Sequence, residues 1–108
     1  MPTQLKLRVF DKRLKKEIPW TPIIPLNSNE EYEVSLFTGR LDDFGHEVYT
    51  DDLVEGSNVL RGVTEDLSVG HIEFAEGQFV LVSKDPSRAP EPLSKFNNLM
   101  IYAHGRAR

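Results

Sequence analysis

Cysteine is absent from this 108-residue chain. Its absence excludes disulfide bonds, metal sites built from thiolates and a cysteine nucleophile. Long apolar runs are also missing, since no stretch approaches the roughly 20 residues that a membrane-spanning helix needs. The opening residues, Met1 to Lys6, lack the apolar stretch of a secretory signal. We therefore expect a protein that has no membrane partner and stays in the cytoplasm.

Familiar catalytic motifs are missing as well. No serine stands in the Gly-x-Ser-x-Gly context of a nucleophile, and the glycines form no phosphate-binding loop. The three histidines, His46, His71 and His104, lack the short spacing of metal ligands. The sequence predicts a protein that is not an enzyme and uses no cofactor.

Positive charge is in short supply, with 13 Lys and Arg against 17 Asp and Glu and a net charge of -4. Nucleic-acid binding depends on neutralising phosphates, so this balance disfavours it. Basic residues nevertheless cluster towards both ends of the chain. If the two ends meet, a basic face for nucleic acid would contain Arg8, Lys12, Lys15, Lys16 and Arg106. Nucleic-acid binding by a small β-barrel is thus an alternative function.

Apolar and polar residues alternate with a period of two, which is typical of half-buried strands. Leu7 and Val9 alternate with charged residues, and Tyr32, Val34 and Leu36 form a second alternating set. Both segments are predicted to be strands.

A hairpin is predicted over residues 70–82, with its tight turn at residues 75–77 and Gly77 in the left-handed region. The strand that begins at Leu53 is predicted to end at residues 55–58, because glycine, serine and asparagine favour turns. Other short strands are predicted at residues 46–49, 53–54, 59–63 and 99–103.

Three prolines punctuate residues 19–25 and remove amide donors, so this segment cannot be a central strand or a helix. We expect an extended edge or a surface crossing. Trp20, Ile23 and Ile24 are expected to pack inward.

The short strands and the turns between them predict an all-β or mainly β fold. At this length, a small partly closed barrel or a curled antiparallel sheet would bury its edges better than an open sheet. At most one or two short helical turns are expected, with residues 92–96 as the candidate. The length is that of one domain, residues 1–108.

Three stretches together resemble one family. They are Lys6 to Asp11, the run from Phe37 to Val54, and the Gly70 to Phe79 hairpin. Within the second stretch, Phe37-Thr38-Gly39, Asp42, Gly45 to Tyr49 and Asp52-Leu53-Val54 carry the pattern. This pattern resembles the YopX-like proteins of phages, prophages and Gram-positive mobile elements.

The resemblance implies a mainly β phage-type protein in a bacterial host cell, and it implies no catalysed reaction. Three positions depart from the pattern. Arg40 replaces an apolar residue, Phe44 replaces Asn, and Asp51 replaces Gly.

An acidic cluster in the centre of the chain suggests a third function, metal-assisted hydrolysis. The cluster comprises Asp42, Asp43, His46, Glu47, Asp51 and Asp52. This hypothesis requires His46 and Asp52 to approach within ligand distance. The alternative is structural, with Asp42 and Asp43 favouring a turn and Asp52 accepting backbone amides beside Thr38 or Gly39.

The leading hypothesis is a non-catalytic module for protein–protein interaction or self-assembly. Trp20 lies between prolines, and Phe44 occupies a turn position that is normally polar. An apolar side chain at a turn either folds under or contacts a partner. The candidate partner contacts are Trp20, Arg40, Phe44 and His46. The partner is expected to be another protein or a second copy in a homo-oligomer.

Overall fold

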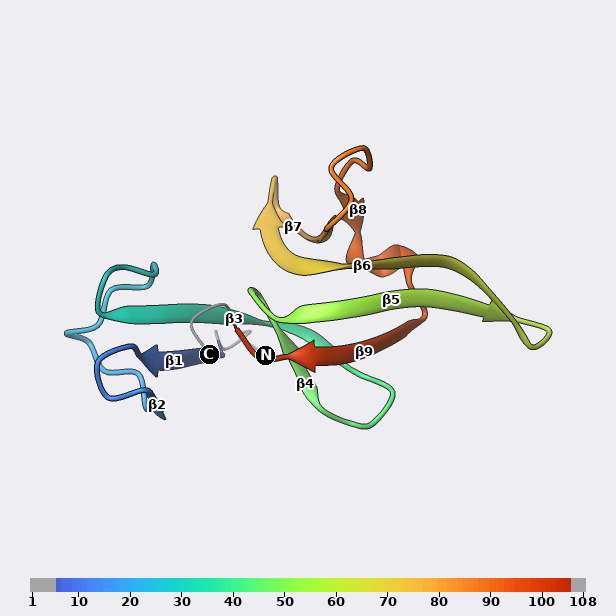
Figure 1. The fold of residues 1–108 in the computed structure, drawn as a ribbon. Helices are drawn as coiled ribbons and strands as arrows, with labels where there is room; N and C mark the ends of the chain where they lie inside the picture. The colour runs from blue at the N-terminus through green and yellow to red at the C-terminus, as the bar shows by residue number, and fades with distance from the viewer. Residues whose placement is uncertain (1–5, 106–108) are drawn as a thin grey trace.

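The structure is a computed structural model that describes residues 6–105, and these residues form two antiparallel sheets (Figure 1). In spatial order, the first sheet consists of β2 (Lys16–Ile18), β1 (Leu7–Asp11), β3 (Tyr32–Leu41) and β4 (Glu47–Tyr49). The second consists of β8 (Glu91–Pro92), β7 (Gln78–Ser83), β6 (Val63–Ala75), β5 (Leu53–Leu60) and β9 (Asn98–Ala103).

The prediction of a mainly β fold is confirmed. Within the described residues, the helical structure amounts to one 3-10 turn, η1 (Leu93–Lys95), at the predicted place. Neither sheet closes on itself, so the barrel alternative is not formed. Over residues 6–105 there is no helix with the length and apolar character that crossing a membrane requires.

Two apolar clusters fill the interior. The smaller cluster lies under the first sheet and consists of Val9, Ile24 and Val34. The larger one consists of Val48, Val54, Ile72, Leu81, Leu93, Phe96 and Leu99. Val48 belongs to β4 of the first sheet, while the other strand residues of this cluster come from the second sheet. The packing of this side chain therefore joins the two sheets.

The β6–β7 hairpin has the predicted turn, with Glu76 at φ 52° and Gly77 at φ 80°. The break predicted at residues 55–58 is wrong, because β5 runs through them to Leu60. A register shift between Gly56 and Asn58 absorbs these turn-forming residues within the strand. The actual turn follows at Arg61 and Gly62, with φ values of 53° and 78°.

As predicted, the proline segment, residues 19–25, contains no strand or helix. The prediction that its three large apolar side chains pack inward holds fully for only one of them. Ile24 is 4% exposed, whereas Ile23 is 87% exposed and Trp20 is 40% exposed. A hydrogen bond from the N–H of Ile24 to the carbonyl oxygen of Thr21 closes a turn here. This turn directs Ile24 inward and leaves Ile23 outside.

The distal part of the β5–β6 hairpin, residues 58–67, extends beyond the end of β9 (Figure 1). We call it the hairpin arm. Pairing of β5 with β9 ends at Ser57 and Asn98, and pairing of β6 with β7 begins only at Gly70 and Ser83. The arm is therefore two-stranded. Four of its apolar residues are more than half exposed, namely Val59, Leu60, Val63 and Leu67.

Candidate functional site

A cleft of about 490 Å³ borders β1 and collects residues from distant parts of the sequence. Trp20 lines it from the proline segment, and His46 lines it from the β3–β4 turn. We call it the Trp20–His46 cleft. Its other lining residues include Leu7, Arg8, Glu17, Ile18, Glu47, Tyr49 and His104.

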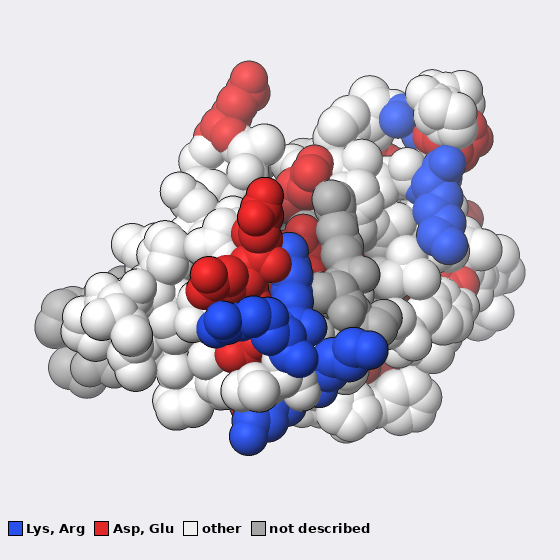
Figure 2. Space-filling model, turned by 60° about the vertical axis from the view of Figure 1, so that its left-hand side comes forward, with Lys and Arg blue, Asp and Glu red and all other residues white. Residues whose placement is uncertain are grey.

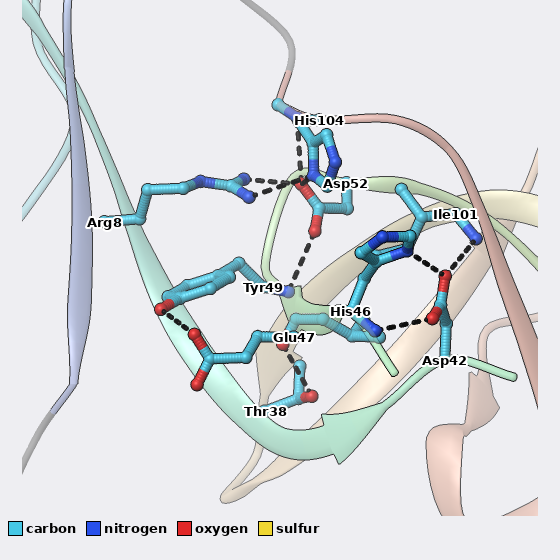
Figure 3. A network of polar contacts seen from close by, with 11 residues as sticks. Arg8, Thr38, Asp42, His46, Glu47, Tyr49, Asp52, Ile101 and His104 are labelled. Carbon is cyan, nitrogen blue, oxygen red and sulfur yellow. Dashed lines mark hydrogen bonds and ion pairs between the residues drawn. The ribbon is translucent and has the colours of Figure 1, made fainter. Parts of the chain in front are cut away.

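A buried ion pair joins β1 to the loop before β5 beside this cleft (Figure 3). Arg8 Nη2 donates to Asp52 Oδ1 at 2.5 Å, and the side chains of Arg8 and Asp52 are 9% and 0% exposed. The Asp52 carboxylate also accepts the backbone N–H groups of Tyr49 and Gly105, both at 2.9 Å. With several donors present, the carboxylate is tolerated in the interior.

Two rings surround this ion pair. The guanidinium carbon of Arg8 lies 4.6 Å from the centre of the Tyr49 ring, a cation–π distance. His104 Nδ1 lies 3.9 Å from Asp52 Oδ1, and the His104 side chain is half exposed. His104 thus separates the buried pair from the cleft opening only in part.

A second carboxylate organises the β3–β4 turn. Asp42 Oδ1 accepts the N–H groups of Phe44 at 3.0 Å and His46 at 2.8 Å. Asp42 Oδ2 accepts the N–H of Ile101 at 3.4 Å and lies 3.3 Å from His46 Nδ1. Burial favours the neutral acid, but the hydrogen bonds from His46, Phe44 and Ile101 outweigh it, and the pKa of Asp42 falls below its ordinary value.

The third polar group is a chain from Lys6 through Glu47 to Tyr49. Lys6 is ion-paired with Glu47, and the Tyr49 hydroxyl donates to Glu47 at 3.3 Å. The hydrogen bond from Lys6 lowers the pKa of Glu47, and burial is the main cause that raises the pKa of Tyr49.

Three groups at or beside the cleft have shifted pKa values. The pKa values of Asp42, Glu47 and Tyr49 all move away from neutrality. A general acid or base works best with a pKa near the operating pH. Asp42, Glu47 and Tyr49 therefore act as fixed charges and hydrogen-bonding groups rather than as acids or bases near neutral pH.

The predicted partner contacts fall into two places. Trp20 and His46 share the Trp20–His46 cleft, and Phe44 precedes its lining residue Gly45. Phe44 is 71% exposed, so its side chain is not folded under the turn. Arg40 does not join them, because it lies in a separate cleft.

The acidic cluster is divided among structural tasks. Asp42 holds the turn as predicted, whereas Asp52 accepts amides from Tyr49 and Gly105 instead of those beside Thr38 or Gly39. His46 is held by Asp42. No three His, Asp or Glu side chains in the described part of the chain gather closely enough to hold a metal ion.

The residues predicted for a basic face lie in different settings. Arg8 is buried against Asp52, and Lys12 donates to the carbonyl oxygen of Asn29 at 2.7 Å. Lys15 and Lys16 are exposed on the β1–β2 hairpin, and Arg106 lies outside the described residues. In Figure 2, Lys and Arg side chains on this side of the molecule lie directly beside Asp and Glu side chains.

Sequence reasoning missed four of the groups at the site: Glu17, Tyr49, His104 and the pairing of Arg8 with Asp52. Arg8 and Asp52 are 44 positions apart. The alternation in β1 indicated only that Arg8 faces away from Leu7 and Val9. One local signal of a turn before Asp52 was present. Asp51 is a residue type that tolerates positive φ, and it adopts φ 70°.

No model of a known protein family matches this sequence, and no curated protein matches it. The resemblance to YopX-like proteins therefore stays a prediction.

Proposed function

We propose that this protein is a non-catalytic recognition module that binds another protein through the Trp20–His46 cleft. The observation that carries the proposal is a convergence. Residues 19–20 and 45–47 stand apart in the sequence, yet both line one open cleft. Trp20 and His46 are also two of the partner contacts that the sequence predicts.

The chemistry of the cleft suits a protein partner. Trp20 is 40% exposed and Phe44 is 71% exposed, and large aromatic side chains dominate the binding energy of many protein interfaces. Glu17 and Glu47 add carboxylates to the lining, and Arg8 borders it with its charge paired to Asp52. Such a surface fits a partner segment with an apolar anchor.

The edge of β1 gives that segment a place to lie. Pairing of β1 with β2 ends at Val9 and Ile18, and Pro19 lacks the N–H that would extend it. Leu7 and Arg8 therefore border the cleft without a paired β2 residue. An extended partner segment could add to this strand edge.

A pull-down from bacterial lysate tests the proposal with three forms of the full chain. Wild type is compared with Phe44→Asp, at the turn beside the cleft, and with Leu14→Asp, at the β1–β2 turn and outside both the cleft and the hairpin arm. Both positions are more than half exposed, so neither change disturbs the core. We expect Phe44→Asp to lose proteins that wild type and Leu14→Asp retain. Equal recovery by all three forms would contradict the proposal.

Self-association is a second candidate function, and a separate observation favours it. The hairpin arm exposes four large apolar side chains on a two-stranded ribbon. Open strand edges with apolar side chains favour pairing with another chain.

A further inference from the structure

A second cleft, of about 470 Å³, lies where β3 of the first sheet meets β7 and η1 of the second. Arg40 enters it from β3 and Phe79 enters it from β7. Leu93, Ser94 and Phe96 line it from η1 and its end. We call it the Arg40 cleft. Its volume lies within the range of small-molecule sites.

Arg40 is held in this cleft by backbone groups alone. Its Nη1 donates to the carbonyl oxygen of Leu93 at 3.1 Å, and its Nη2 donates to that of Phe96 at 2.7 Å. A guanidinium has five N–H donors, so these bonds leave most of them for a ligand.

The charge of Arg40 is not balanced by a neighbour. Within residues 6–105, no ion pair includes Arg40, whereas the equally long side chain of Arg8 is paired with Asp52. The two carbonyl oxygens fix the guanidinium in position without neutralising it. A partly buried cation of this kind attracts an anion.

The other walls of the cleft determine the body of the ligand. Leu93 and Phe96 are almost fully buried in the larger apolar cluster, so the half-buried Phe79 is the apolar side chain that a ligand can cover. Ser94 and Asn97 add polar side chains to the lining. The cleft therefore offers one fixed cation beside an apolar wall.

We propose that the Arg40 cleft binds the carboxylate of a small organic acid with an apolar body. A planar carboxylate matches the fork of the guanidinium, and one negative charge balances one positive charge. A phosphate dianion would need a second cation, and Arg88 and Lys95 are already paired with Glu91. A free acid and the C-terminal carboxylate of a peptide share this chemistry.

Titrations followed by NMR chemical shifts test the site in the full chain. Phenylacetate and hexanoate represent free acids, and N-acetyl-phenylalanine represents a peptide C-terminus. We expect saturable shifts of the Arg40 Nε–H and of the backbone amides of Ser94 and Asn97. One charge-assisted contact and a small apolar wall predict a Kd on the order of 1 mM. The matched uncharged amides should bind more weakly than the acids, by a factor of about ten or more.

Two variants separate a ligand site from a structural role of Arg40. Arg40→Gln removes the charge, and Ser94→Phe fills the cleft while keeping Arg40 and its two carbonyl partners. Both should abolish the shifts, and the matched control Arg88→Gln should retain them. Should Arg40→Gln fail to fold, Ser94→Phe decides alone. The proposal is overturned if the amides bind as well as the acids, if none of the acids shifts these resonances, or if Ser94→Phe binds like wild type. Binding of N-acetyl-phenylalanine alone would assign the site to peptide C-termini.

Discussion

Among single residues, Asp52 connects three separate parts of the chain. Its carboxylate binds Arg8 of β1, the N–H of Tyr49 at the end of β4, and the N–H of Gly105 near the C-terminus. Each donor comes from a different segment, so one side chain positions three borders of the Trp20–His46 cleft. Such a buried group stabilises the fold only while all its partners remain.

Replacing Asp52 should therefore be costly. We expect Asp52→Asn to lower the free energy of unfolding by about 3–5 kcal/mol, because Arg8 is left buried without a counter-charge. Urea unfolding followed by Trp20 fluorescence measures this loss. The matched control is Glu47→Gln, which removes an exposed ion pair and should change stability far less. Equal losses of unfolding free energy for the two variants would show that the buried Arg8–Asp52 pair contributes no more to stability than the exposed Lys6–Glu47 pair.

Asp42 predicts a specific dependence on pH. Its pKa in the folded protein lies below the ordinary value of 3.8, because the hydrogen bonds to His46, Phe44 and Ile101 outweigh the effect of burial. The unfolded state therefore binds the proton more tightly, and the stability due to Asp42 is lost as pH falls below that value. Between about pH 6 and about pH 3, wild type should lose more stability than Asp42→Asn. Urea midpoints at both pH values test this, and parallel losses would refute it.

Local chemistry made some residues predictable and left others hidden. Asp42, Phe44 and Gly45 behave as turn residues, because their preferences act within four positions. The partner of Arg8 was not predictable, since alternation assigns a face to a side chain but names no counter-ion. Ile23 was misplaced because the turn at Thr21 rotates it outward.

At the level of elements, hairpins were predictable where turn and strand signals agree. The β6–β7 hairpin has both, with Gly77 between two alternating strands. Within β5 the signals conflict, because Gly56 and Asn58 resemble a turn. Gly56 faces the ring of Phe96, the residue after η1, and a Cβ on Gly56 would lie 2.8 Å from that ring. In the sequence, a glycine that tertiary packing requires thus looks the same as a glycine that marks a turn.

Gly70 in β6 gives a sharper prediction about sheet packing. A Cβ at this position would lie 1.9 Å from the carbonyl oxygen of Val82 on β7. Because that atom is backbone, Gly70→Ala has to separate the two strands, and we expect a loss of about 3 kcal/mol or more. Gly56→Ala meets a side chain that can shift, so it should cost less. Thermal unfolding of both variants orders the two losses, and the reverse order would contradict this reading of the sheet.

For the whole molecule, the candidate site depends on the strand order of the first sheet. The strands and turns that carry Trp20 and His46 were predictable, but their convergence was not. It requires β1 to lie between β2 and β3 and the β3–β4 turn to return beside it, a topology that no local pattern specifies. Of the two predicted arrangements, the barrel is not formed, since both antiparallel sheets stay open, and the hairpin arm projects beyond the β5–β9 pairing.

The hairpin arm leads to a prediction about assembly. Two copies can pair their arms about a two-fold axis, which would cover Leu60 and Val63 and satisfy open strand edges. We expect wild type to dimerise in sedimentation equilibrium and Leu60→Asp to raise the dissociation constant by about tenfold or more. Leu14→Asp is the matched control, because Leu14 is 61% exposed and Leu60 is 60% exposed. A monomeric wild type would contradict the prediction. Equal weakening by both variants would also contradict it, because the added charge alone would then explain the effect of Leu60→Asp.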